Sequence, residues 1–202
     1  MTIDLRSRLE AALGKTGPLS SDFDLDGQVK LPEGRVLRPA GVLVPIVTRG
    51  AEARVVLTKR SPALKHHPGQ IAFPGGKVDP GDGDEIAAAL REAREEIGLQ
   101  SDQAEVLGTL PPHETVTSFT VTPVLALVDS EFRPVAEEGE VDEVFEVPFS
   151  HIVTLANYSV QARQWRGQPR HYFTVPWGPY YIWGATARML RGLAERMADD
   201  PN

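Results

Sequence analysis

Residues 84–97 constrain the fold of this chain more than any other segment does. Ile86, Leu90, Ala93 and Ile97 recur at three- and four-residue spacing, which places them on one face of a helix. The glycine that follows Ile97 stands where helices commonly end. We therefore expect a helix from about residue 84 to residue 97 that buries this apolar face.

Three glutamates stand beside the apolar face. Glu92, Glu95 and Glu96 lie at i, i+3 and i+4, so their carboxylates project from one patch. Mg²⁺ prefers one or two carboxylates together with substrate phosphates. The patch therefore predicts a metal platform for diphosphate chemistry. The alternative is a solvated helix face on which Arg91 and Arg94 form surface ion pairs with these acids.

Residues 75–99 resemble the Nudix box, a Gly, an acid and then Arg-Glu-aliphatic-x-Glu-Glu-x-Gly-aliphatic. The matching residues are Gly76, Arg91, Glu92, Glu95, Glu96, Gly98 and Leu99. Two features depart from the pattern: the first acid is Asp82 rather than Glu, and the spacer before Arg91 is one residue longer. In the family this acid typically pairs with the box arginine, and here either Asp82 or Glu85 can do so.

The resemblance implies a metal-dependent hydrolase in which water attacks a diphosphate. Glu92, Glu95 and Glu96 would hold Mg²⁺ or Mn²⁺, with the Gly75 carbonyl as a further ligand and Glu92 also a candidate base. Arg91 would complete the catalytic group. Many members use another glutamate outside the box, for which Glu143 is the first candidate and Glu140 the second.

Residues 56–76 resemble the signature of the coenzyme A diphosphatase branch of this family. The residues in register are Leu57, Thr58, Arg60, Ser61, Gly69, Phe73, Pro74, Gly75 and Gly76, with Lys65 where that pattern has Arg. The longer box spacer and residues 182–188 are also similar to this branch. The resemblance implies that Arg60, Ser61, Lys65, Gly69 and Phe73 bind substrate.

The implied reaction is hydrolysis of coenzyme A or its thioesters to 3′,5′-ADP and 4′-phosphopantetheine. Arg60, Lys65, His66 and His67 form a basic cluster that suits phosphates. One alternative is a broader Nudix hydrolase acting on ADP-ribose, dinucleoside polyphosphates or damaged nucleotides. Another is an inactive domain that senses a nucleotide, although such a domain would not need all three glutamates.

The remaining sequence predicts one α/β (α+β) domain, and the resemblance implies an α/β/α sandwich with a mixed central sheet. We expect an N-terminal helix and connector over residues 1–38 and the catalytic domain over residues 39–198. Residues 4–14 read as the first helix and 183–198 as the last. Strands are expected at 41–48, 54–58, 104–110, 119–128, 143–147, 157–163 and 170–175, and a Pro- and Gly-rich loop at 61–83.

Composition narrows the partners to small molecules. The net charge is -7, which argues against a broad nucleic-acid-binding surface. No apolar run is long enough to span a bilayer, so no membrane association is expected. The chain has no cysteine and no signal-peptide pattern, and we expect a cytoplasmic protein. The oligomeric state stays open, a homodimer included.

Overall fold

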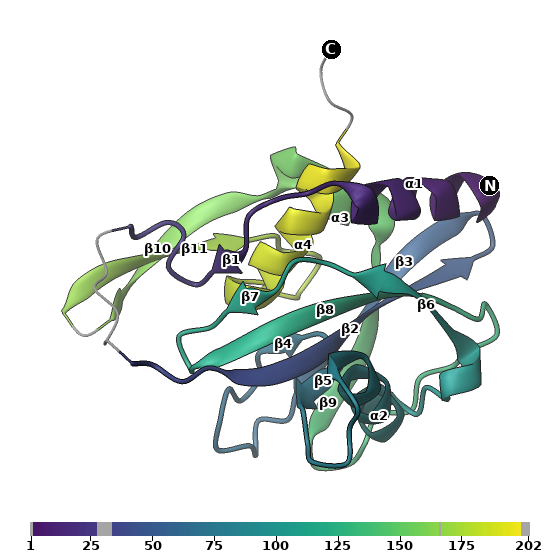
Figure 1. Cartoon of the computed structure of the whole chain (residues 1–202), viewed down its shortest axis with the longest axis horizontal. Helices are drawn as coiled ribbons and strands as arrows, with labels where there is room; N and C mark the ends of the chain where they lie inside the picture. The colour runs from purple at the N-terminus through teal and green to yellow at the C-terminus, as the bar shows by residue number, and fades with distance from the viewer. Residues whose placement is uncertain (1, 28–33, 166, 199–202) are drawn as a thin grey trace.

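A mixed sheet of nine strands forms the centre of the computed structural model, which describes residues 2–27, 34–165 and 167–198 (Figure 1). The long strands β2 and β8 run parallel, whereas β2 and β3 run antiparallel. The bounds are β1 Ser20–Ser21, β2 Arg38–Arg49, β3 Glu52–Arg60, β4 Ile71–Ala72, β5 Gly75–Lys77, β6 Ala104–Thr109, β7 His113–Glu114, β8 Phe119–Val128 and β9 Val141–Pro148.

Helices cover both faces of this sheet (Figure 1). Helix α2 (Glu85–Ile97) packs on one face, and α1 (Thr2–Gly14), α3 (Phe149–Val153) and α4 (Gly184–Met197) lie on the other. Short 3₁₀ turns occupy Ser101–Gln103 and Leu155–Asn157. A separate hairpin, β10 (Ser159–Trp165) and β11 (Gln168–Thr174), extends beside α4. The result is the predicted α/β/α sandwich with a mixed central sheet.

The central strands are apolar on both faces because each face has its own core. On β3, Val55 and Leu57 belong to the core beneath α4, while Val56 between them belongs to the core beneath α2. Successive side chains of a strand point to opposite faces. A strand covered on both sides therefore reads as an unbroken apolar run, as this one does.

Helix α2 lies directly against the backbone of β2. A Cβ atom at Gly41 would lie 1.9 Å from the carbonyl oxygen of Glu85, so only glycine fits there. Asp84 caps the helix by accepting a hydrogen bond from the Ala87 N–H at 2.8 Å, and Gly98 ends it in the left-handed conformation. These local signals set the ends of α2, and the glycine sets its depth on the sheet.

The predicted helix 84–97 is confirmed, with one change in what it buries. Ala93 and Ile97 are fully buried, but Ile86 and Leu90 are only half-buried. The strands predicted between residues 41 and 128 are also confirmed, and the later ones differ in their ends. Four short strands (β1, β4, β5 and β7) and helix α3 were not predicted, because elements of two to five residues carry no clear periodic pattern.

The N-terminal segment is integrated with the rest of the fold. Helix α1 packs against α4, and β1 pairs with β7. Residues 28–33 of the predicted connector lie outside the described residues. The boundary between residues 38 and 39 stays a prediction.

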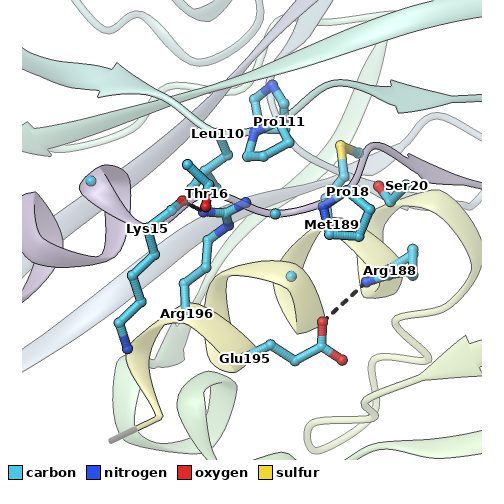
Figure 2. Close-up of a pocket in the computed structure, with 14 residues that line it drawn as sticks. Lys15, Thr16, Pro18, Ser20, Leu110, Pro111, Arg188, Met189, Glu195 and Arg196 are labelled. Atoms are coloured by element: carbon cyan, nitrogen blue, oxygen red, sulfur yellow. Dashed lines mark hydrogen bonds and ion pairs between the residues drawn. The ribbon is translucent and has the colours of Figure 1, made fainter. Parts of the chain in front are cut away.

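A cavity of about 600 Å³ separates the start of the connector from α4 (Figure 2). Arg196 donates to the Lys15 carbonyl, and the Lys15 ammonium group donates to the Ala198 carbonyl at 3.0 Å. Arg188 forms ion pairs with Glu195 and with Asp24. These cations hold the connector to the last helix. None of the residues that line this cavity belongs to β5 or α2.

We predict that Gly41→Ala destabilises the protein by about 3 kcal/mol or more, because the new methyl group forces α2 away from β2. Urea denaturation measures this change. Gly14→Ala is the control, since its Cβ would meet nothing within 4 Å, and it should change stability by less than about 0.5 kcal/mol. A Gly41→Ala protein as stable as wild type would contradict the close packing.

Candidate active site

The three glutamates of α2 differ in their exposure to solvent. The Glu96 side chain is only 6% exposed, Glu92 is 17% exposed and Glu95 is 52% exposed. The N–H of Gly75 donates to Glu96 Oε2 at 3.1 Å. The three glutamates therefore lie at different depths beside the apolar face, and Glu96, the least exposed, is buried against β5.

Burial, together with the negative charges of Glu92 and Glu140, raises the pKa of Glu96 to about 7. The Gly75 N–H and the Arg60 guanidinium, 3.9 Å from Glu96 Oε1, oppose this rise only in part. Burial also raises the pKa of Glu92, with Glu95 and Glu140 adding repulsion. Negative charge at this site is thus under-compensated by the protein's own cations.

Arg91 connects the loop before α2 to the glutamates. Its Nε and Nη2 donate to the two carboxylate oxygens of Asp82 at 3.0 and 2.9 Å. Its Nη1 donates to Glu92 at 2.9 Å and to Glu95 at 3.2 Å. The hydrogen bond from Arg91, with that from the Asp79 N–H, lowers the pKa of Asp82. Between the two acids left open by the sequence, Asp82 is the partner of Arg91.

These residues fit a divalent cation. A Cβ at Gly76 would lie 2.4 Å from Glu92 Oε1, so the backbone of β5 packs directly against this carboxylate. Within the described residues no three acids or histidines already form a metal-binding group, and Arg91 bonds to both Glu92 and Glu95. A hydrated Mg²⁺ or Mn²⁺ needs no all-protein cage, and it would supply the missing positive charge.

Among the described glutamates outside α2, Glu140 is the one that raises the pKa of the buried glutamates. Its charge acts on both Glu92 and Glu96. Glu143, the first candidate from the sequence, instead accepts a hydrogen bond from the Tyr180 hydroxyl at 2.5 Å. Tyr180 stacks on Phe145 at 3.6 Å, which holds that hydroxyl in place. The geometry therefore favours the second candidate over the first.

A cleft of about 410 Å³ opens beside Gly75 and Gly76. Cations and aromatic rings from distant parts of the chain line it. They are Arg60, His67, Lys77, Phe119, Arg163, Arg170, Tyr172 and Trp183. A cleft with this lining, next to under-compensated carboxylates, suits an anionic ligand that also carries an aromatic or apolar part.

Comparison with known proteins shows the family of this chain. The model of the NUDIX domain matches residues 37–168. The chain belongs to the Nudix family. A Nudix hydrolase named NudL and described as uncharacterized, from Enterobacter sp. (strain 638), is 42% identical over 164 residues, which are 81% of this chain and 85% of that protein. The Escherichia coli (strain K12) protein of the same name is 41% identical, with the same coverage.

The Nudix fold is also found in a solved structure of low sequence identity. The NUDIX domain of Shewanella oneidensis NrtR, crystallised with ADP ribose, is 13% identical and has a TM-score of 0.52. The match covers 85% of this chain and 96% of that one. This chain is therefore a Nudix hydrolase, of a family that acts on diphosphate-containing substrates and generally needs divalent metal ions. None of its described helices is long and apolar enough to cross a membrane.

Of the five substrate-binding residues predicted from the Nudix resemblance, only Arg60 lines the cleft. Phe73 is 3% exposed and packs in the core. The Ser61 hydroxyl accepts a hydrogen bond from the Ala63 N–H at 3.3 Å, so it shapes a turn. Gly69 has a φ of 69° and donates its N–H to the Arg60 carbonyl at 3.1 Å. Lys65 is exposed outside the cleft.

These residues of the signature thus build the loop that carries Arg60. The register between β3 and β9 shifts between Lys59 and Arg60, and such bulges re-aim side chains. Further along, the Thr186 hydroxyl donates to the Ile71 carbonyl at 3.0 Å, which joins the start of α4 to the same loop. The two segments that resemble the coenzyme A branch are therefore in contact.

The sequence did not indicate that the β10–β11 hairpin forms one wall of the cleft, here called the hairpin wall, or which residues hold that wall in place. Asp22 accepts from the Val116 N–H at 2.8 Å and lies 3.2 Å from Arg170 and 3.3 Å from His113. Two residues further, Asp24 pairs with Arg188. Alternate acids in a segment classed as a connector were the available signal, but the arginines that pair with them lie more than 140 residues away.

We predict that Asp22→Asn destabilises the protein by about 1–3 kcal/mol at neutral pH, because it breaks a buried charged hydrogen-bond group. Burial alone would raise the pKa of Asp22, but the hydrogen bond and charge of His113, the Val116 N–H and Arg170 together lower it from its usual 3.8. The stabilisation is therefore full above pH 3.8 and is lost as the pH falls through the lower folded-state value.

Urea denaturation of both proteins from neutral pH downward, as far as wild type folds, measures this difference. Asp102→Asn, at an exposed site, is the control and should match wild type at each pH. A difference between Asp22→Asn and wild type that stays constant on acidification would rule out ionised Asp22 as the source of the stability.

Proposed function

We propose that this Nudix hydrolase cleaves the diphosphate bond of coenzyme A or its thioesters, giving 3′,5′-ADP and (acyl-)4′-phosphopantetheine. The observation that carries the proposal is the position of Arg60. This residue of the coenzyme A signature lies on the cleft wall 3.9 Å from Glu96. A guanidinium there can hold a diphosphate against the carboxylates of α2.

Glu92, Glu95 and Glu96, with the Gly75 carbonyl, would hold Mg²⁺ or Mn²⁺. A bound cation neutralises charge on the diphosphate and lowers the pKa of the attacking water. Arg91 orients Glu92 and Glu95 from its bidentate contact with Asp82. Glu92 and Glu140 are the candidates to accept a proton from the attacking water, because the charge of Glu140 contributes to the raised pKa of Glu92.

We expect activity to require an added divalent cation and to be removed reversibly by a chelator. Glu92→Gln and Glu96→Gln should each lower kcat by at least about 10²-fold. Glu96→Gln should keep its melting temperature, because the amide oxygen still accepts from Gly75 and a buried charge is removed. Steady-state kinetics and thermal unfolding measure these effects.

Glu131→Gln is the matched control, since the Glu131 side chain is 84% exposed and lies outside the cleft. Its kcat should equal that of wild type. Undiminished turnover in excess chelator would contradict the metal-dependent mechanism. Near-normal activity of Glu96→Gln would mean that the glutamates are only structural.

A substrate panel tests the proposed substrate directly. Coenzyme A, acetyl-CoA, ADP-ribose and a dinucleoside polyphosphate are each assayed with Mg²⁺ and with Mn²⁺, and the products are identified by mass spectrometry. We expect the highest kcat/KM for coenzyme A or its thioester, with 3′,5′-ADP as a product. A higher kcat/KM for ADP-ribose or the dinucleoside polyphosphate would instead identify a broader nucleotide diphosphatase.

A further inference from the structure

The hairpin wall of the cleft carries two arginines that face each other. Arg163 on β10 pairs in register with Arg170 on β11, and both line the cleft. Like charges directly opposite in a sheet are destabilising. Two cations in this arrangement therefore need negative charge, either from the protein or from a ligand.

The protein supplies such charge to Arg170, which lies 3.2 Å from Asp22 and is largely buried. Arg163 is exposed and, among the described residues, has no carboxylate within ion-pair distance. Its contact is with the ring of Trp183, whose centroid lies 4.5 Å from the guanidinium carbon. The positive charge at this wall is thus only partly compensated.

Trp183 holds the Arg163 guanidinium in a defined place. Its ring also makes an edge contact with Tyr172 at 5.0 Å, so the aromatic support is itself packed. A guanidinium on an aromatic face keeps its N–H groups in the plane, where they can donate to an anion. The contact with Trp183 therefore preorganises a cationic hydrogen-bond donor in the lining of the cleft.

This wall is distinct from the one that carries Arg60. Arg60 comes from β3 and lies beside Glu96, where the diphosphate under attack would lie. The hairpin arginines come from β10 and β11; Arg163 lies within the residues that match the NUDIX domain, and Arg170 lies just beyond their end at residue 168. The cleft therefore offers one cation at the carboxylates and a second cationic group elsewhere.

We propose that Arg163, with Arg170 behind it, forms a subsite for a phosphate monoester that the substrate carries in addition to its diphosphate. This assignment deepens the proposed function and rests on it, since in coenzyme A that group is the 3′-phosphate. The chain's net charge of -7 repels a further phosphate, so a local cationic subsite is needed to admit it.

Calorimetric titration of adenosine 3′,5′-bisphosphate and of AMP, in the presence of Mg²⁺, tests the subsite without turnover. Wild type should bind the bisphosphate at least about tenfold more tightly than AMP, as one charge-assisted hydrogen bond provides. Arg163→Gln should bring this ratio close to one while AMP affinity stays unchanged. Arg163→Lys, which retains the charge, should recover part of the ratio.

Arg133→Gln is the control, because Arg133 is 67% exposed and does not line the cleft; its ratio should match wild type. Equal wild-type affinities for the two ligands, or a ratio unchanged in Arg163→Gln, would overturn the proposal. So would an equal loss of affinity for both ligands, which would mean that Arg163 only supports the packing of Trp183.

The two proposals fail in different ways. If coenzyme A is not hydrolysed but the bisphosphate preference exists and depends on Arg163, the subsite stands and only the proposed activity is wrong. If coenzyme A is hydrolysed and its kcat/KM advantage over dephospho-coenzyme A survives in Arg163→Gln, the activity stands and the subsite is wrong.

Discussion

Backbone meets backbone where α2 lies on β2, because a Cβ atom at Gly41 would come within 1.9 Å of the Glu85 carbonyl oxygen. The same helix meets β5 at Gly76, against the carboxylate of Glu92. These contacts bring the acidic side of α2 into the fold, and Glu96 becomes buried with only the Gly75 N–H and the Arg60 guanidinium, 3.9 Å away, to balance its charge. The electrostatic character of the site thus follows from how closely a helix can approach a strand.

Arg91 balances the negative charge of the other acids at this site. It binds Asp82 in a bidentate manner and also contacts Glu92 and Glu95, but it does not contact Glu96. The compensation is therefore incomplete at the most buried of the three acids. A site that only stabilised the fold would gain from complete pairing, since an uncompensated buried charge is unfavourable. The deficit of positive charge is what a catalytic cation would correct.

Much of the fold and the acidic centre could be predicted, because both are local patterns. Helix α2, the long strands and the three glutamates follow from spacing along the chain. The burial of Glu96 could not be predicted from the sequence. This side chain stands at the edge of the apolar face of α2, and it is buried only because the helix packs so closely on the sheet. The burial of Phe73 could not be predicted either, because a motif shows that a residue matters, not whether it packs in the core. The roles of Glu140 and Asp82 depend on loop paths that have no periodicity.

The cleft shows why net charge is a poor guide to local binding. Arg60 ends β3, whereas Arg163 and Arg170 lie about 100 residues later on β10 and β11, so no single basic run in the sequence brings the three together. Two acids of the connector pair with arginines of the C-terminal part: Asp22 pairs with Arg170, and Asp24 pairs with Arg188 in α4. Each of these pairs joins the N-terminal segment to the C-terminal third of the chain. The connector therefore anchors the hairpin wall of the cleft. Some of the acidic residues that give the chain its negative net charge hold the arginines of this region in place.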